Sequence, residues 1–162
     1  MNGALNCYKL SEDNLAICRA MCLMDDVKSA KALCDQTDDS PACYHLARYF
    51  ERKKNYKEAV SYFQRAGAIS NAIRICKEHD LKDSLASLAF QGSSQDMLVA
   101  ARYYEKIAGQ EDKAVLLYHK AGHTSKAVNL AFKANKYAEL SLITDGLNEK
   151  TDPQLVKRVA EF

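Results

Sequence analysis

The sequence repeats itself at an offset of 54 to 55 residues, and this feature restricts the possible folds more than any other. The run 46–51 (LARYFE) matches the run 100–105 (AARYYE), with four identical positions at an offset of 54. Further on, the run 63–67 (FQRAG) matches 118–122 (YHKAG) at an offset of 55. A repeat of this length indicates supersecondary units that stack in a row and bury their apolar faces against each other.

Within each copy, apolar residues recur at the spacing of an amphipathic helix. Cys43, Leu46 and Phe50 lie at positions i, i+3 and i+7, which places them on one helix face. Ala59 and Ala72 are 13 residues apart, and their counterparts in the second copy keep this distance. Each long repeat is therefore predicted to contain four short helices, that is, two helical hairpins.

These patterns predict an all-α fold, an α-solenoid of short antiparallel helix pairs similar to tetratricopeptide repeats. We expect residues 1–162 to form a single solenoid segment, with repeat copies at about 40–93 and 94–150. Partial copies are expected at 11–39 and 151–162, which suggests an excerpt from a longer solenoid. No stretch alternates with period two for long, so no strand is predicted.

Polar residues and glycines mark the expected ends of the helices. Ser40 before Pro41 is typical of a helix start, and Ser94, at the repeat offset, is expected to cap the equivalent helix. Gly67 and Gly122 fall where two helices should stop.

The charges are nearly balanced, which bears on possible partners. Lysine and arginine number 23 and the acidic residues 21, so the formal net charge is +2. Nucleic acids and anionic membranes require a clustered basic face, and neither is expected as a partner. The run Arg52-Lys53-Lys54 suits the negative end of a helix dipole. No run approaches the ~18 apolar residues of a membrane span, so no insertion into a membrane is expected.

The six cysteines and four histidines form no pattern that is typical of a chemical site. Five of the cysteines fall on apolar helix faces, as reduced core residues do. The pairs Cys18/Cys22 and His119/His123 are each four residues apart, but a structural zinc ion needs four ligands. Cys76 and His79 lack a third, orienting group. We expect no catalytic residue, no cofactor-binding residue and no metal site, so the chain is not predicted to be an enzyme.

Two repeated pairs of side chains are the candidate interaction residues. Arg48 and Tyr49 recur as Arg102 and Tyr103, just off the buried helix face. The arginine stems could simply cover a neighbouring helix. Alternatively, the pairs could form a ladder of arginine and tyrosine on a binding surface, because both residue types are enriched in interface hot spots.

Several runs carry a resemblance that is more specific than a generic solenoid. They are 44–48 (YHLAR), 71–78 (NAIRICKE), 100–105 (AARYYE) and 114–123 (AVLLYHKAGH). Together they resemble the tetratricopeptide-type C-terminal half of the intraflagellar transport protein 140 family, from about Leu15 to Phe162.

The resemblance implies a non-catalytic scaffold of intraflagellar transport complex A, which supports retrograde ciliary transport and the movement of membrane proteins into cilia. The implied partners are other complex A subunits and adaptors of ciliary membrane proteins. The implied location is the cytoplasm, the cilium and the ciliary basal body. The propellers that precede the solenoid in that family are absent from this sequence, so no role of theirs is carried over.

Two other functions fit the same helical pattern. Vesicle-coat subunits also combine propellers with solenoids, and the chain could be a segment of one. It could instead be an adaptor whose groove captures a short peptide. The repeat pattern does not distinguish these alternatives.

Overall fold

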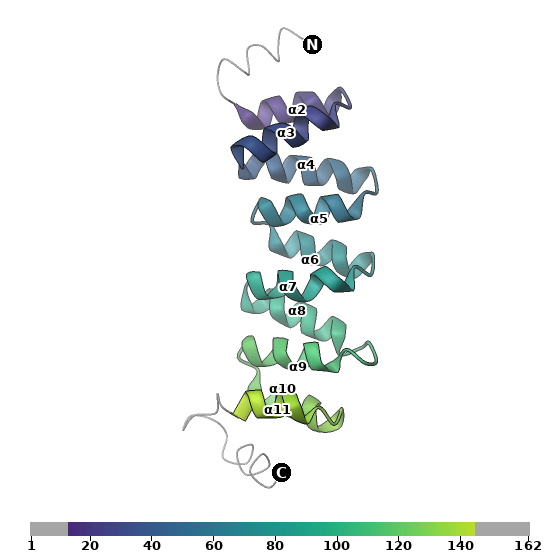
Figure 1. Cartoon of the computed structure of the whole chain (residues 1–162), viewed down its shortest axis with the longest axis vertical. Helices are drawn as coiled ribbons and strands as arrows, with labels where there is room; N and C mark the ends of the chain where they lie inside the picture. The colour runs from purple at the N-terminus through teal and green to yellow at the C-terminus, as the bar shows by residue number, and fades with distance from the viewer. Residues whose placement is uncertain (1–12, 145–162) are drawn as a thin grey trace. The chain divides into compact units, whose positions relative to one another are not determined.

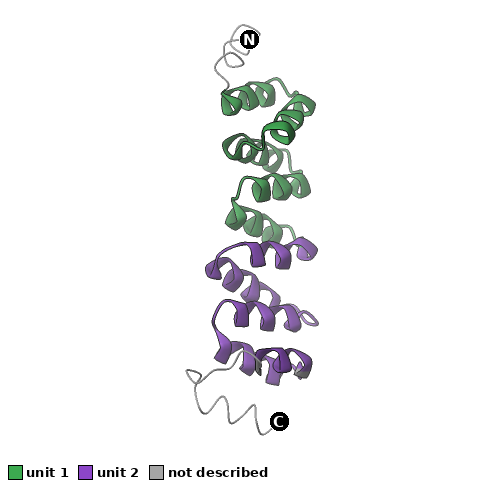
Figure 2. Ribbon diagram, turned by 60° about the vertical axis from the view of Figure 1, so that its left-hand side comes forward, with its two compact units in different colours: residues 1–81 green, residues 82–162 purple. Residues whose placement is uncertain are grey.

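The computed structural model describes residues 13–144, apart from the side chains of Tyr137 and Thr144. These residues form ten helices and no strand, which confirms the expected all-α fold. Cys7 and the expected partial copy at 151–162 lie outside the described residues. Contacts divide the chain into two compact units, residues 1–81 and 82–162 (Figure 2).

Unit 1 contains helices α2 to α6, each packed against its neighbour in sequence (Figure 1). Helix α4 also packs against α2, so α2 lies on both α3 and α4. The bounds are α2 Asn14–Leu23, α3 Val27–Thr37, α4 Ser40–Arg52, α5 Tyr56–Arg65 and α6 Ile69–Glu78.

Unit 2 repeats this arrangement of successive packed helices. Its bounds are α7 Lys82–Gln91, α8 Ser94–Tyr104, α9 Glu111–Lys120, α10 Thr124–Lys133 and α11 Tyr137–Thr144. Among the described residues, no helix is long and apolar enough to cross a membrane.

The cores of both units use equivalent residues. Leu46, Ala47 and Phe63 are buried in unit 1, and Ala101 and Tyr118 occupy corresponding positions in unit 2. Buried alanines allow helices to approach closely, and the aromatic rings fill the remaining space. The apolar pattern that predicted the helices is therefore also the pattern of burial.

The repeat is visible in the backbone of the turns. Several turns contain a residue with left-handed φ, and these residues recur at an offset of 55: Lys54 and Gly109, Gly67 and Gly122, Asp80 and Asn135. After α5, Ala68 N–H donates to Phe63 C=O at 2.9 Å and Gly67 N–H to Gln64 C=O at 3.0 Å. These paired bonds form a Schellman motif, which satisfies carbonyls that the helix leaves unbonded. The same sequence period thus sets both the burial and the turn geometry.

The structure corrects two helix starts by one residue. Asp39, and not Ser40, caps α4, because its carboxylate accepts a hydrogen bond from Ala42 N–H at 2.8 Å. Ser93, and not Ser94, caps α8 in a capping box with Asp96. In each case two adjacent polar residues could serve as the cap, and the one whose side chain reaches the free N–H groups of the first turn does so.

A glutamate at the end of the first helix in each copy binds the third helix. Glu51 accepts a hydrogen bond from Arg74 of α6 at 2.6 Å. Glu105 lies 54 positions later, and its carboxylate is 3.3 Å from the Lys126 ammonium of α10. Tyr118 of α9 donates to the same Glu105 carboxylate at 2.5 Å. The hydrogen bond from Tyr118, followed by Lys126, lowers the pKa of Glu105.

The Glu105 contact predicts a pH-dependent stability for unit 2. A carboxylate whose folded pKa is lowered stabilises the fold above its unfolded pKa, and this stabilisation is lost as pH falls through the folded value. Tyr118→Phe removes the main cause, and we expect it to cost about 1 kcal/mol at neutral pH. The difference between wild type and variant should shrink when pH falls below 4.5, the ordinary pKa of the carboxyl group. Urea titrations at neutral and acidic pH measure this difference, and a gap that is constant with pH would contradict the assignment.

The five cysteines of the described residues are free and buried. Burial raises the pKa of Cys76 to about 11 and that of Cys43 to about 12. Hydrogen bonds with the thiols of Cys22 and Cys34, together with burial, raise the pKa of Cys18. These three thiols are therefore protonated and shielded at neutral pH.

Thiol-labelling kinetics test this protection. A Cys7→Ser, Cys22→Ser variant removes the one cysteine outside the described residues and the one buried thiol that keeps some exposure. The four remaining thiols, each fully buried, should react with a disulfide reagent only as fast as the helices open. After denaturation all four should react at once. Rapid labelling of any of them in the folded protein would show that the burial is wrong.

Candidate functional site

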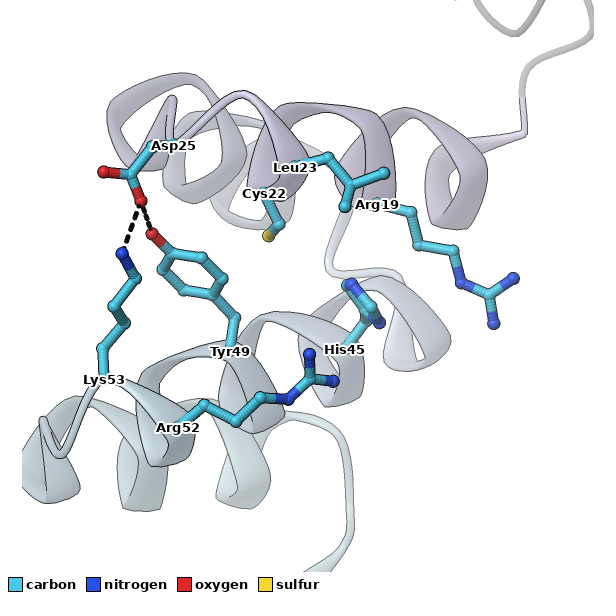
Figure 3. Close-up of a pocket in the computed structure, with 8 residues that line it drawn as sticks. All are labelled: Arg19, Cys22, Leu23, Asp25, His45, Tyr49, Arg52 and Lys53. Carbon is cyan, nitrogen blue, oxygen red and sulfur yellow. Dashed lines mark hydrogen bonds and ion pairs between the residues drawn. The ribbon is translucent and has the colours of Figure 1, made fainter.

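An open cleft between α2 and α4 of unit 1 combines charged and apolar side chains (Figure 3). Its volume is about 520 Å³, which is in the size range of ligand and peptide pockets. Helix α2 and the turn after it contribute four lining residues, and α4 with its C-cap contributes the other four. They are Arg19, Cys22, Leu23, Asp25, His45, Tyr49, Arg52 and Lys53.

The spacing along the two helices brings these residues to one place. His45, Tyr49 and Arg52 lie at i, i+4 and i+7 of α4, so they project from one face. Arg19, Cys22 and Leu23 lie at i, i+3 and i+4 of α2. Because α2 packs against α4, the two faces meet across the cleft.

One end of the cleft is closed by an interaction between charged groups. The Tyr49 hydroxyl donates a hydrogen bond to Asp25, and the Lys53 ammonium lies 3.0 Å from the same carboxylate (Figure 3). Both contacts lower the pKa of Asp25, the one from Tyr49 more strongly. The Lys53 ammonium also lies 5.4 Å from the centre of the Tyr49 ring, within range of a cation–π contact. This end is therefore internally neutralised.

The other end of the cleft is lined by two positively charged arginines. Figure 3 shows His45 between the side chains of Arg19 and Arg52. Burial, and then the charges of Arg19 and Arg52, lower the pKa of His45. The imidazole is therefore neutral at neutral pH, and the positive field of this end comes from the two guanidinium groups.

The structure places the four predicted interaction residues in two different units. Arg48 is exposed and its guanidinium forms an ion pair with Glu51 at 2.7 Å, within α4. Tyr49 is half-buried and lines the cleft. In unit 2, Arg102 is exposed, and the Tyr103 ring lies edge-on to Tyr104 with centroids 5.8 Å apart. Tyr49 is thus brought together with cleft residues that the sequence did not indicate.

Two other candidate pairs from the sequence each include a histidine. Cys76 is fully buried, whereas His79 is exposed and stacks on Tyr56. Gly122, between His119 and His123, adopts φ 85° just after α9 ends. Within residues 13–144, no group of three or more histidine, cysteine or acidic side chains is placed to hold a metal ion.

Comparison with known protein families shows to which family the chain belongs. Residues 1–162 match the model of the TPR domain shared by intraflagellar transport proteins 140 and 172. The chain belongs to this family. The match covers the whole sequence, and it confirms the resemblance to the intraflagellar transport protein 140 family and the tetratricopeptide-like solenoid. The TPR domain of this family is an interaction fold, and it connects the chain with intraflagellar transport and the cilium.

Proposed function

We propose that this chain is a non-catalytic scaffold of intraflagellar transport complex A, which supports retrograde transport and the movement of membrane proteins into cilia. The observation that carries the proposal is the family match over residues 1–162, joined to the run 114–123 (AVLLYHKAGH). This run resembles protein 140, whereas the family model includes both protein 140 and protein 172. The partners are other complex A subunits and adaptors of ciliary membrane proteins, and the location is the cytoplasm, the cilium and the basal body.

A second candidate function arises because the family includes two different intraflagellar transport proteins. Intraflagellar transport protein 172 belongs to complex B, so a chain of this family could serve that complex instead. Affinity purification of the tagged chain from ciliated cells, followed by mass spectrometry, separates the two. Recovery of complex A subunits supports the proposal. Recovery of complex B subunits, or of vesicle-coat subunits, would overturn it.

We further propose that Arg48, Tyr49, Arg102 and Tyr103 contact the partners. The support is that both arginines are exposed and that Tyr49 lines a cleft. Alanine substitution of both arginines should reduce the recovery of partner subunits while the circular dichroism spectrum stays unchanged. Lys57→Ala with Gln95→Ala, a pair of exposed positions on α5 and α8, is the control and should leave recovery unchanged.

A further inference from the structure

The cleft between α2 and α4 has an excess of positive charge. Among its lining residues, Lys53 is paired with Asp25. Within residues 13–144, no ion pair joins Arg19 or Arg52 to a carboxylate. Two guanidinium groups therefore face the cleft without an anionic partner in this part of the chain, and guanidinium groups bind carboxylates with two parallel hydrogen bonds.

An apolar surface adjoins these two charges. The Cys22 thiol and the Tyr49 ring line the cleft between its two ends (Figure 3). Leu23 is 79% exposed although it is a large aliphatic residue. An occupant that covers this surface would remove Leu23 from water, which is favourable in proportion to the apolar area buried.

We propose that this cleft binds an acidic peptide segment of a partner protein, whose carboxylates pair with Arg19 and Arg52 and whose apolar side chain covers Leu23. The inference rests on the proposed function only in that the partner is a protein. The charge complementarity names the occupant, because two arginines beside an apolar surface match a segment in which acidic and aliphatic residues are mixed.

A nucleic acid fits the cleft less well. Binding to a nucleic acid backbone depends on several phosphate contacts along a basic track. Here Asp25 already neutralises Lys53 at one end, which leaves two cations. The formal net charge of +2 for the chain also gives little long-range attraction to a polyanion.

Direct binding to the purified full chain tests the proposal. The probe is a fluorescent peptide in which glutamate alternates with leucine, and the matched probe has glutamine in place of glutamate. Fluorescence polarisation should show binding of the glutamate peptide, weaker binding of the glutamine peptide and a loss of affinity with added salt. Equal affinity for both peptides, or no binding, would overturn the proposal.

Variants locate the site. Arg19→Ala with Arg52→Ala should weaken binding of the glutamate peptide by about tenfold or more, because charge-assisted hydrogen bonds are lost. Lys57→Ala is the control, since this cation is exposed on α5 and does not line the cleft. An equal loss in the control, or none in the double variant, would show that the cleft is not the site. Circular dichroism verifies that both variants keep their helices.

His45 supplies a signal that is specific to the occupied cleft. The charged groups that face it are Arg19 of α2 and Arg52 of α4, and its pKa is lowered by burial and then by these two arginines. Bound carboxylates would offset these charges, so the pKa of His45 in an NMR titration should rise when the glutamate peptide is added.

An unchanged His45 titration, or tighter binding of phosphoinositide vesicles or single-stranded DNA than of the peptide, would overturn the proposal. These outcomes do not depend on which complex the chain joins, so they are distinguishable from a failure of the affinity purification.

Discussion

Replacing Phe63 by alanine is expected to lower the free energy of unfolding of unit 1 by about 3 to 5 kcal/mol. Phe63 of α5 is fully buried, and its ring lies edge-on to Tyr44 of α4 with centroids 5.3 Å apart. The substitution removes a large apolar surface from the core and also the aromatic contact, and the close-packed helices can fill the cavity only in part. Urea unfolding followed by circular dichroism measures the loss.

A matched control uses the same change at an exposed position. Phe90 of α7 is 44% exposed, so Phe90→Ala should cost less than about 1 kcal/mol. Because repeat proteins can unfold part by part, amide hydrogen exchange should accompany the titration. The Phe63 variant should lose protection in α4 and α5 first. If both variants lost the same stability, Phe63 would not be a core residue.

Much of the fold could be predicted because one sequence period controls several physical properties. The offset of 54 to 55 residues sets the buried face, as with Phe63 and Tyr118, and also the left-handed turn residues Gly67 and Gly122. The proposed limits of the copies, 40–93 and 94–150, stay a prediction. The predicted capping residues of α4 and α8 were each wrong by one position, because two adjacent polar residues could cap each helix.

The cleft could be predicted only in part. His45, Tyr49 and Arg52 share a helix face by their spacing, which the sequence contains. Arg19 joins them only because α2 packs on α4 as well as on α3. That contact is tertiary, and no local pattern specifies it. The repeat pattern instead indicated Arg48 as an interaction residue, because it recurs as Arg102. In the structure Arg48 forms an ion pair with Glu51 of its own helix.

The second large effect is expected at Arg65, which joins α5 to the C-terminal end of α3. Its guanidinium donates to Cys34 C=O at 2.8 Å and to the Asp38 carboxylate at 3.0 Å, and it also binds Asp35. Asp38 has a left-handed φ of 48° and ends α3, so Arg65 stabilises the turn where the chain leaves this helix. The hydrogen bond to Asp35 is the main cause of the raised pKa of Arg65.

Arg65→Met keeps the aliphatic stem and removes every one of these donors. We expect a loss of about 2 to 3 kcal/mol in the free energy of unfolding of unit 1, because a half-buried carbonyl and two carboxylates lose their common partner. Arg48→Met is the matched control, since this guanidinium is exposed and its ion pair with Glu51 lies within one helix. This variant should cost less than about 0.5 kcal/mol. Hydrogen exchange should show faster opening of α3 in the Arg65 variant alone. Equal losses in the two variants would mean that the contacts of Arg65 stabilise the fold no more than a single surface ion pair does.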